Sequence, residues 1–229
     1  MIGNAEQSVA VVCVDGPSGA GKGTISQMLA QRLGYHLLDS GALYRVTALS
    51  ASRKGIDFTD EAGLVTAALN LAVRFEPTPA GEPARVLLDG LDVTREIRTE
   101  TCGDNASRVA VIPAVRHALL QLQRDFRQAP GLVADGRDMG TVVFPEAQVK
   151  VFLTASAEER AERRHRQLLD AGVDVKISHL LSEIKARDDR DMNRTAAPLK
   201  PAADAQIIDT TGLGIEEVLD QVLLLIGRR

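Results

Sequence analysis

The stretch Ser8–Thr24, SVAVVCVDGPSGAGKGT, decides the fold of this chain. Its first half, Ser8–Asp15, is a short apolar run rich in β-branched residues, which predicts a buried β-strand. Its second half, Gly16–Thr24, is rich in glycine and contains Lys22, and the residues that follow, Ile25–Leu33, have helical spacing. A glycine-rich loop between a strand and a helix is the structural context of a phosphate-binding loop.

Each part of this loop suits the binding of a nucleoside triphosphate. Glycines let the backbone curl so that successive N–H groups point at phosphate oxygens, and the N-terminus of the next helix adds positive potential. The Lys22 ammonium would reach the β- and γ-phosphates. A glycine-rich turn with a surface lysine is the alternative interpretation. The residues expected to bind ATP are Gly16, Pro17, Ser18, Gly19, Ala20, Gly21, Lys22, Gly23 and Thr24.

The metal side of the loop departs from the general pattern GxxxxGK[ST]. In that pattern a hydroxyl that binds Mg²⁺ follows the lysine directly, but here Gly23 takes its place and Thr24 comes next. We therefore expect Thr24 and water molecules to supply this side of a magnesium site.

Further apolar segments complete a parallel α/β fold. Runs at 35–38, 132–135, 149–153 and 205–209 predict four more buried strands, and the helical patterns between them indicate βαβ units. Helices are expected at about 25–33, 40–52, 103–128 with a break near Pro113, 156–171, 178–192 and 215–226. Only 3% of the residues are aromatic although 45% are hydrophobic, so the core consists of small aliphatic side chains, which suits a parallel sheet. We expect a three-layer P-loop NTPase fold with a five-stranded parallel sheet.

Residues 58–100 interrupt this alternation. The pattern predicts a small helix at 58–70 and short strands at 71–76, 85–89 and 91–93, joined by the loop EPTPAGEP. We assign 58–100 to a small antiparallel insertion, and 1–57 together with 101–229 to the core. Within the core, residues 156–192 are expected to form a helical lid, and Ser156 with Glu159 has the spacing of a capping box.

The composition excludes several classes of protein. A net charge of −4 argues against a nucleic-acid binder. No run of ~18 apolar residues predicts a membrane span. The segment MIGNAEQ lacks the pattern of a secretory signal, and the two cysteines have no metal-ligand spacing. We expect a cytoplasmic monomer that binds neither nucleic acid nor membranes.

A second group of polar residues follows the predicted strands 35–38 and 132–135. In LLDSGALYR, Ser40 and Arg45 either contact an anion or serve only as helix cap and solvated side chain, and the residues alone leave both open. In DGRDMGT, Asp135 ends an apolar strand, where acidic residues orient Mg²⁺ in P-loop enzymes, and Arg137 and Asp138 follow it. A simple turn after the strand is the alternative for this segment.

Two clusters of arginines lie near the C-terminus. Arg187, Asp191 and Arg194 share one helix face, whereas 188–190 fall elsewhere and are expected to be solvated or paired among themselves. Arginines at positions 160, 163 and 164 have helical spacing and would neutralise phosphate charge if they close over ATP. Salt-bridged or solvated surface helices are the alternative for both clusters. The segment AAPLKP at 196–201 is expected to be extended because of its prolines.

Taken together, these segments resemble the bacterial-type cytidylate kinases. The resemblance rests on DGPSGAGKGT, LLDSGALYR, EIRT, ADGRDMGTVVFP, RDDRDMNR and AAPLKPAADA, which occur in the family's order over nearly the whole chain. The insertion at 58–100 matches the extended region of that family that binds the nucleoside monophosphate. The resemblance implies the reaction ATP + CMP (or dCMP) ⇌ ADP + CDP (or dCDP), with Mg²⁺.

The same resemblance assigns residues to roles. It implies catalytic roles for Lys22, Arg137, Arg164 and Arg187, and metal binding by Thr24 and Asp135. Ser107 and Arg116 match positions that read the cytosine edge. The full set implied for CMP comprises Ser40, Tyr44, Arg45, Ser107, Arg116, Arg137, Asp138, Arg187, Asp191 and Arg194.

Two other functions stay open at this point. The first is a kinase for another small acceptor, such as a different nucleoside monophosphate or shikimate. The second is a non-catalytic module that only binds a nucleotide. The insertion and the segment DGRD count against the first, and the arginine clusters, which suit a second phosphate-bearing ligand, count against the second.

Overall fold

The strand β1 (Ala10–Asp15) lies at the centre of a five-stranded parallel sheet with the order β2, β6, β1, β7, β8. The computed structural model describes residues 9–76, 78, 84–170 and 172–227. Five predicted strands are confirmed, although Ser8, the expected start of the first, lies outside the described residues. The other strands of this sheet are β2 (His36–Asp39), β6 (Gly131–Gly136), β7 (Val149–Thr154) and β8 (Gln206–Asp209).

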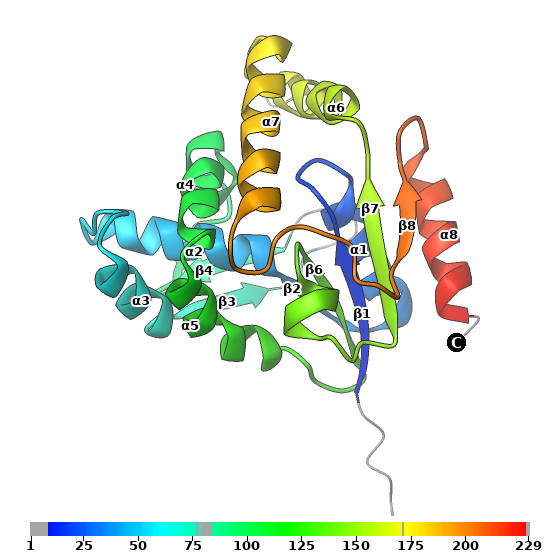
Figure 1. Ribbon diagram of the computed structural model, residues 1–229, viewed down its shortest axis with the longest axis horizontal. Coiled ribbons are helices and arrows are strands. Elements are labelled where there is room, and N and C mark those ends of the chain that lie inside the picture. Colours follow the sequence, from blue (N-terminus) through cyan, green and yellow to red (C-terminus); the bar gives the residue numbers. More distant parts are fainter. Residues whose placement is uncertain (1–8, 77, 79–83, 171, 228–229) are drawn as a thin grey trace, which may run out of the picture.

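Helices cover both faces of this sheet, as the predicted three layers require (Figure 1). On one face α1 (Lys22–Leu33) and α8 (Ile215–Gly227) pack on aliphatic side chains of β1, β6 and β7. On the other face Leu43 of α2 (Ser40–Arg53) packs beside Leu132 and Ala134. Because every strand end of a parallel sheet points the same way, the loops after β1, β2 and β6 meet at one edge.

The insertion forms a separate antiparallel sheet with the order β3, β4, β5. Its buried side chains Val86 and Leu88 pack against Ala42 and Val46 of α2, which fixes the sheet beside the core. The predicted loop at 76–83 lies outside the described residues except at Glu76 and Thr78. The elements of this region are α3 (Glu61–Leu69), β3 (Val73–Glu76), β4 (Arg85–Leu88), β5 (Leu91–Asp92) and η1 (Glu96–Arg98).

The long helical stretch divides at Pro113 as predicted. It forms α4 (Glu100–Ala110) and α5 (Pro113–Arg124), since proline fits the first turn of a helix but not its interior. Both helices share a hydrophobic core with α2 and α3. The assignment of 58–100 as a unit of its own stays a prediction.

Two helices lie above the carboxyl ends of the strands, in the segment predicted to be a lid (Figure 1). That they act as a lid stays a prediction. They are α6 (Ala157–Asp170) and α7 (Ile177–Asn193). One bond of the expected capping box is present, because the Glu159 backbone N–H donates to Ser156 Oγ at 3.1 Å. In the part of the chain that the structure describes, no helix is long and apolar enough to cross a membrane.

Two local features differ from the sequence prediction. The segment Met139–Val143 (η2) forms a short π-helix after β6, which was not predicted from the sequence. The predicted extended segment at 196–201 instead turns at Ala197, whose φ is 51°. Arg194 stabilises this turn by donating through Nε to the Ala197 carbonyl oxygen at 2.6 Å.

Candidate active site

The glycine-rich loop between β1 and α1 has the backbone geometry of a phosphate cradle. Gly19 and Gly21 have φ values of 81° and 86°, a region that side chains with a Cβ rarely adopt. At Gly16 a Cβ would lie 2.0 Å from the carbonyl oxygen of Leu153 on β7. The glycines therefore let the loop curl closely against the sheet and begin α1 at Lys22.

Lys22 is turned inward onto its own loop. Its side chain is 5% exposed, and Nζ donates to the Pro17 carbonyl oxygen at 2.8 Å and lies 4.0 Å from Asp135 Oδ1. Burial, and then the positive charge of Arg137, lowers the pKa of Lys22. Burial likewise raises the pKa of Asp135, an effect that Lys22 opposes. An anion bound at the loop would therefore stabilise the charged form of Lys22.

Thr24 and Asp135 meet the requirements of a magnesium site in part. Oxygen ligands suit Mg²⁺, which usually takes few protein ligands together with phosphate oxygens and water. A Cβ at Gly23 would lie 3.5 Å from Asp135 Oδ2, so the missing side chain leaves this carboxylate facing the loop. Thr24 is exposed on the cavity wall. Among the described residues no cluster of three or more carboxylate, histidine or cysteine side chains offers a complete metal site.

A cavity of about 880 Å³ opens beside the loop, large enough for a nucleotide. One wall is the loop itself, and α6 and α7 form the wall opposite. Arg45 of α2 and Glu100 of α4 line the side next to the insertion. Another part of the wall is formed by Thr210, Leu213, Gly214 and Ile215. The cavity therefore joins the expected ATP loop to elements that were predicted to hold the acceptor.

Arg45 and Arg187 line the cavity on the side next to the insertion, and Arg137 lies close enough to Arg187 to affect its pKa. The Arg45 side chain is held in place by a hydrogen bond, in which Nη1 donates to the Ile97 carbonyl oxygen at 2.8 Å. Within the described part of the chain, the buried Nε of Arg187 has no hydrogen-bond partner. Burial, then Arg137 and Arg45, lowers the pKa of Arg187 to about 10. Three like charges in a desolvated place form a site for a multiply charged anion.

Three further predicted residues form a buried polar group below this cavity. Arg116 contacts Asp138 through Nη2, and its Nη1 donates to the Ala110 carbonyl oxygen at 3.1 Å. Arg194 Nη2 lies 3.8 Å from the other carboxylate oxygen of Asp138 and has no hydrogen-bond partner. The Arg116 guanidinium lies 5.5 Å from the ring centre of Tyr44. These side chains combine hydrogen-bond donors with one carboxylate acceptor in a site shielded from water.

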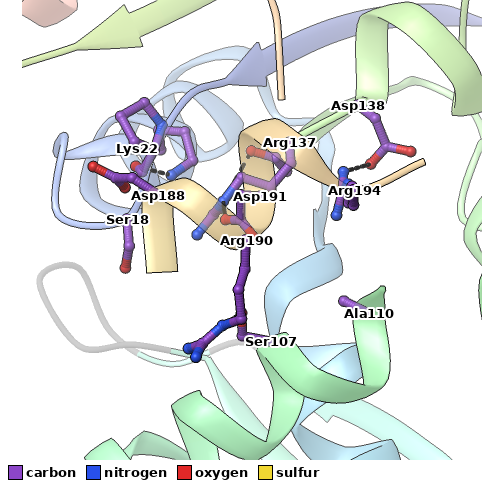
Figure 2. Close-up of polar contacts among 12 residues, drawn as sticks. Ser18, Lys22, Ser107, Ala110, Arg137, Asp138, Asp188, Arg190, Asp191 and Arg194 are labelled. Carbon is purple, nitrogen blue, oxygen red and sulfur yellow. Dashed lines mark hydrogen bonds and ion pairs between the residues drawn. The ribbon is translucent and has the colours of Figure 1, made fainter. Parts of the chain in front are cut away.

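The last turns of α7 lie between the arginines of the cavity and the buried polar group of Arg116, Asp138 and Arg194 (Figure 2). Asp191 accepts from Arg137 Nε at 3.1 Å. Arg190 donates through Nε to Ser107 Oγ at 3.1 Å and through Nη2 to Asp104 Oδ1 at 2.6 Å. Over the described residues Arg190 lines the cavity but Ser107 does not, so the arginine separates Ser107 from the cavity.

The prediction for residues 188–190 was wrong in two places. Arg190 pairs with α4, and Asp188 is buried and receives two bonds from Arg160 of α6. Asp189 alone is exposed, as expected. Helical spacing identifies which residues share a face, but it does not say which face meets another helix.

The arginines of α6 make different contacts. Arg163 donates to the backbone carbonyl of Thr210 at 2.6 Å. Arg164 lines the cavity and donates through Nε to Glu100 Oε1 at 2.6 Å, which links the lid to α4. Arg160 is buried and does not belong to a solvated face. All three arginines line the cavity, but only the side chains of Arg163 and Arg164 are partly exposed.

The residue that caps α2 is Asp39 and not Ser40. Asp39 caps α2, because its Oδ1 accepts from the Ala42 backbone N–H at 2.8 Å. Ser40 is buried at the first helical position and makes no cap. Its hydroxyl lies beside the DGRD segment, since a Cβ at Gly136 would be 2.7 Å from Ser40 Oγ.

The sequence reading missed Asp15. Its two carboxylate oxygens accept the backbone N–H groups of Met139 and Gly140, each at 2.8 Å. Burial raises the pKa of Asp15 to about 7, although these two bonds oppose the shift. Asp15 thereby holds the π-helix that follows Arg137 and Asp138. A polar residue at the end of an otherwise apolar strand was the available signal.

Comparisons with known proteins agree with this geometry. A family model described as cytidylate kinase matches residues 12–228. A protein of Shewanella frigidimarina named cytidylate kinase is 60% identical over 219 residues, which is 96% of each chain. One of Aeromonas hydrophila with the same name is 59% identical over 217 residues, covering 95% of this chain and 94% of the relative. The solved structure of an uncharacterized protein from Eubacterium ventriosum, 11% identical, has a TM-score of 0.52 over 96% of this chain and 99% of its own, a likeness of fold.

Proposed function

This chain belongs to the cytidylate kinase family, and we therefore propose that it transfers the γ-phosphoryl group of ATP to CMP or dCMP. The products are ADP and CDP or dCDP. The observation that carries the proposal is one cavity lined by the glycine-rich loop and, on the side next to the insertion, by Arg45 and Arg187. Arg137 lies close enough to Arg187 to lower its pKa. Two phosphate-bearing ligands placed there would have their phosphates next to each other.

The donor phosphates lie in the loop Gly16–Thr24. Their oxygens accept from successive backbone N–H groups and from the N-terminus of α1. In the free protein Lys22 Nζ donates to Pro17 and is partly desolvated. An approaching phosphate offers the ammonium a charged partner, so Lys22 turns to the β- and γ-phosphates and stabilises the charge that develops during transfer.

The acceptor phosphate lies against Arg45, Arg137 and Arg187. One of its oxygens attacks the γ-phosphorus while the bond from that phosphorus to the β–γ bridging oxygen breaks, and ADP leaves. A phosphate oxygen needs no general base, so catalysis consists of positioning and fixed positive charge. Arg164, on the lid side of the cavity, adds further charge when its pair with Glu100 opens.

Mg²⁺ fits this site because Thr24 and Asp135 offer a hydroxyl and a carboxylate on the loop side. The ion would neutralise charge on the β- and γ-phosphate oxygens. Asp135 lies beside Lys22 and would hold the metal ion on the loop side of the cavity. We assign Thr24 and Asp135 as the metal-side residues.

The acceptor base lies against Arg116 and Asp138 of the buried polar group and against Ser107. The cytosine amino group is a donor, which the Asp138 carboxylate accepts, and Arg116 donates to the acceptor atoms of the ring. Uracil presents a carbonyl to Asp138 instead, which leaves the buried carboxylate without a donor. Because unpaired buried polar groups weaken binding, UMP should bind more weakly than CMP. Tyr44, Ser40, Asp191 and Arg194 complete the site around the sugar and base.

Entry of the base requires Arg190 to leave Ser107, since Arg190 separates that residue from the cavity. We infer that α6 and α7 move when the acceptor binds and close once both substrates are present. Closure excludes water, which would otherwise hydrolyse ATP. The enzyme acts on free nucleotides in the cytoplasm as a monomer.

A panel of acceptors tests this proposal. With ATP and Mg²⁺ held constant, ADP release is measured with CMP, dCMP, UMP, AMP, GMP and shikimate. We expect CMP and dCMP to exceed AMP and GMP by a wide margin, with UMP in between. Equal rates with AMP and CMP would contradict the base assignment. ATP binding without transfer to any acceptor would favour the non-catalytic module.

A further inference from the structure

Arg160 bonds to three separate parts of the chain. The side chain is 4% exposed and begins on α6. Nε donates to the Ala155 carbonyl oxygen at 3.1 Å, and Nη1 donates to the Ser18 carbonyl oxygen of the phosphate loop at 3.0 Å. Nη1 and Nη2 also donate to Oδ1 and Oδ2 of Asp188 on α7, at 3.0 Å and 2.5 Å. One guanidinium thus joins the loop to both lid helices.

These bonds leave Arg160 little capacity for a substrate. A guanidinium has five N–H donors, and four donor–acceptor contacts are already made within the protein. The loop also packs directly on the side chain, because a Cβ at Gly19 would lie 3.1 Å from Arg160 Cβ. Arg160 therefore differs from Arg163 and Arg164, which line the same lid but are only partly buried.

Asp188 is placed among the acceptor-binding residues of α7. It directly follows Arg187, which faces the cavity, and it precedes Asp191, the partner of Arg137, by one helical turn. Arg160 therefore connects the Ser18 carbonyl group of the loop to the turn of α7 that carries Arg187 and Asp191.

We propose that Arg160 and Asp188 are positioning residues that couple occupation of the ATP loop to the placement of the acceptor-binding turn of α7. The inference rests on the function proposed above, in which ATP and CMP occupy the two ends of one cavity. Neither residue touches the reacting atoms. Their pair makes the binding of one substrate favour the binding of the other, because both substrates stabilise the same arrangement of loop and helix.

Two conservative variants separate the two bonds of this link. Arg160→Lys keeps a charge next to Asp188 but cannot also reach Ser18, because an ammonium lacks the planar fork of a guanidinium. Asp188→Asn keeps the shape and leaves Arg160 on Ser18, but it removes the charged pair to α7. The control is Glu146→Gln, which breaks an exposed pair with Arg127 away from the cavity.

Calorimetry measures the affinity for a non-hydrolysable ATP analogue alone, and that for CMP with and without the analogue. In the unaltered protein the analogue should tighten CMP binding. Arg160→Lys should weaken analogue binding on the order of tenfold, the usual effect of losing a charge-assisted bond. Both variants should bring the two CMP affinities to the same value, and the double variant should add little to either. Glu146→Gln should change neither quantity.

A purely structural role predicts another result. Both variants would then lower the melting temperature but leave analogue affinity and its effect on CMP unchanged, which would overturn the proposal. If Arg160→Lys does not fold, Asp188→Asn alone decides between the two results. Affinity for the ATP analogue is measured without an acceptor. A lower analogue affinity in Arg160→Lys therefore supports the link to Ser18 even if the unaltered protein proves to use an acceptor other than CMP.

Discussion

Gly103 makes room for two of the acceptor arginines. It lies in the first turns of α4, and an ideal Cβ there would be 3.2 Å and 3.3 Å from Arg45 Nη1 and Nη2, and 3.3 Å from Arg187 Nη1. Comfortable contacts between heavy atoms begin at about 3.5 Å. The variant Gly103→Ala therefore forces both guanidinium groups to shift by a few tenths of an ångström. Arg45 has little freedom to do so while its Nη1 donates to the Ile97 carbonyl oxygen at 2.8 Å.

The expected effects on binding and on stability have opposite signs. Alanine inside a helix is more stable than glycine by about 1 kcal/mol. Hydrogen bonds to charged groups contribute about 1.5–3 kcal/mol each. If the shift removes half of one such bond from each arginine, CMP loses roughly 2 kcal/mol, about a 30-fold change in dissociation constant. Affinity for an ATP analogue should not change, because the described atoms nearest the added Cβ belong to Arg45 and Arg187 and not to the loop.

Calorimetric titration with CMP and thermal unfolding measure the two effects on one sample. The control is Gly227→Ala in α8, where the added Cβ meets open space. We expect Gly103→Ala to bind CMP about 30-fold more weakly at an unchanged or raised melting temperature. Unchanged CMP affinity in a variant that folds normally would refute the assignment of Arg45 and Arg187 to the acceptor phosphate.

Three more predictions follow from buried charges. Lys22→Met should reduce transfer about a thousandfold without lowering the melting temperature, since it removes a desolvated ammonium; turnover near that of the unaltered protein would contradict its role. Burial lowers the pKa of Lys22, and the phosphates of ATP should raise it again, so ATP binding at pH 8 should take up a proton. The observed binding enthalpy should therefore differ between two buffers of different ionisation enthalpy; equal observed enthalpies in the two buffers would exclude this. Asp15→Asn places an amide N–H against a backbone N–H of η2. This variant should lower the free energy of unfolding by about 1–3 kcal/mol and weaken CMP binding. An unchanged denaturation midpoint would show that the two bonds to Asp15 contribute nothing to stability.

The strands and the loop could be predicted because their signals are local. A buried parallel strand needs a continuous apolar run, as in Ala10–Asp15, and a phosphate loop needs glycines at fixed places. The break at Pro113 follows from the missing N–H of proline. None of these depends on which distant residue comes to lie nearby.

The links between elements could not be predicted, because they depend on tertiary contacts. Asp188 lies in a charged stretch whose spacing also suits a solvated helix, and its partner is 28 residues away. The π-helix after Asp138 depends on Asp15, which is 124 residues from Met139. Charged side chains in a helix carry no local sign of the helix that will cover them.

The central claim is that the γ-phosphoryl group passes from ATP to CMP, and following that group tests it most directly. The protein is incubated with Mg²⁺, CMP and ATP labelled at the γ-phosphate, and the labelled products are separated. We expect the label in CDP, with one labelled CDP for each ADP formed. Label in free phosphate, or in no product while ATP remains bound, would contradict the account.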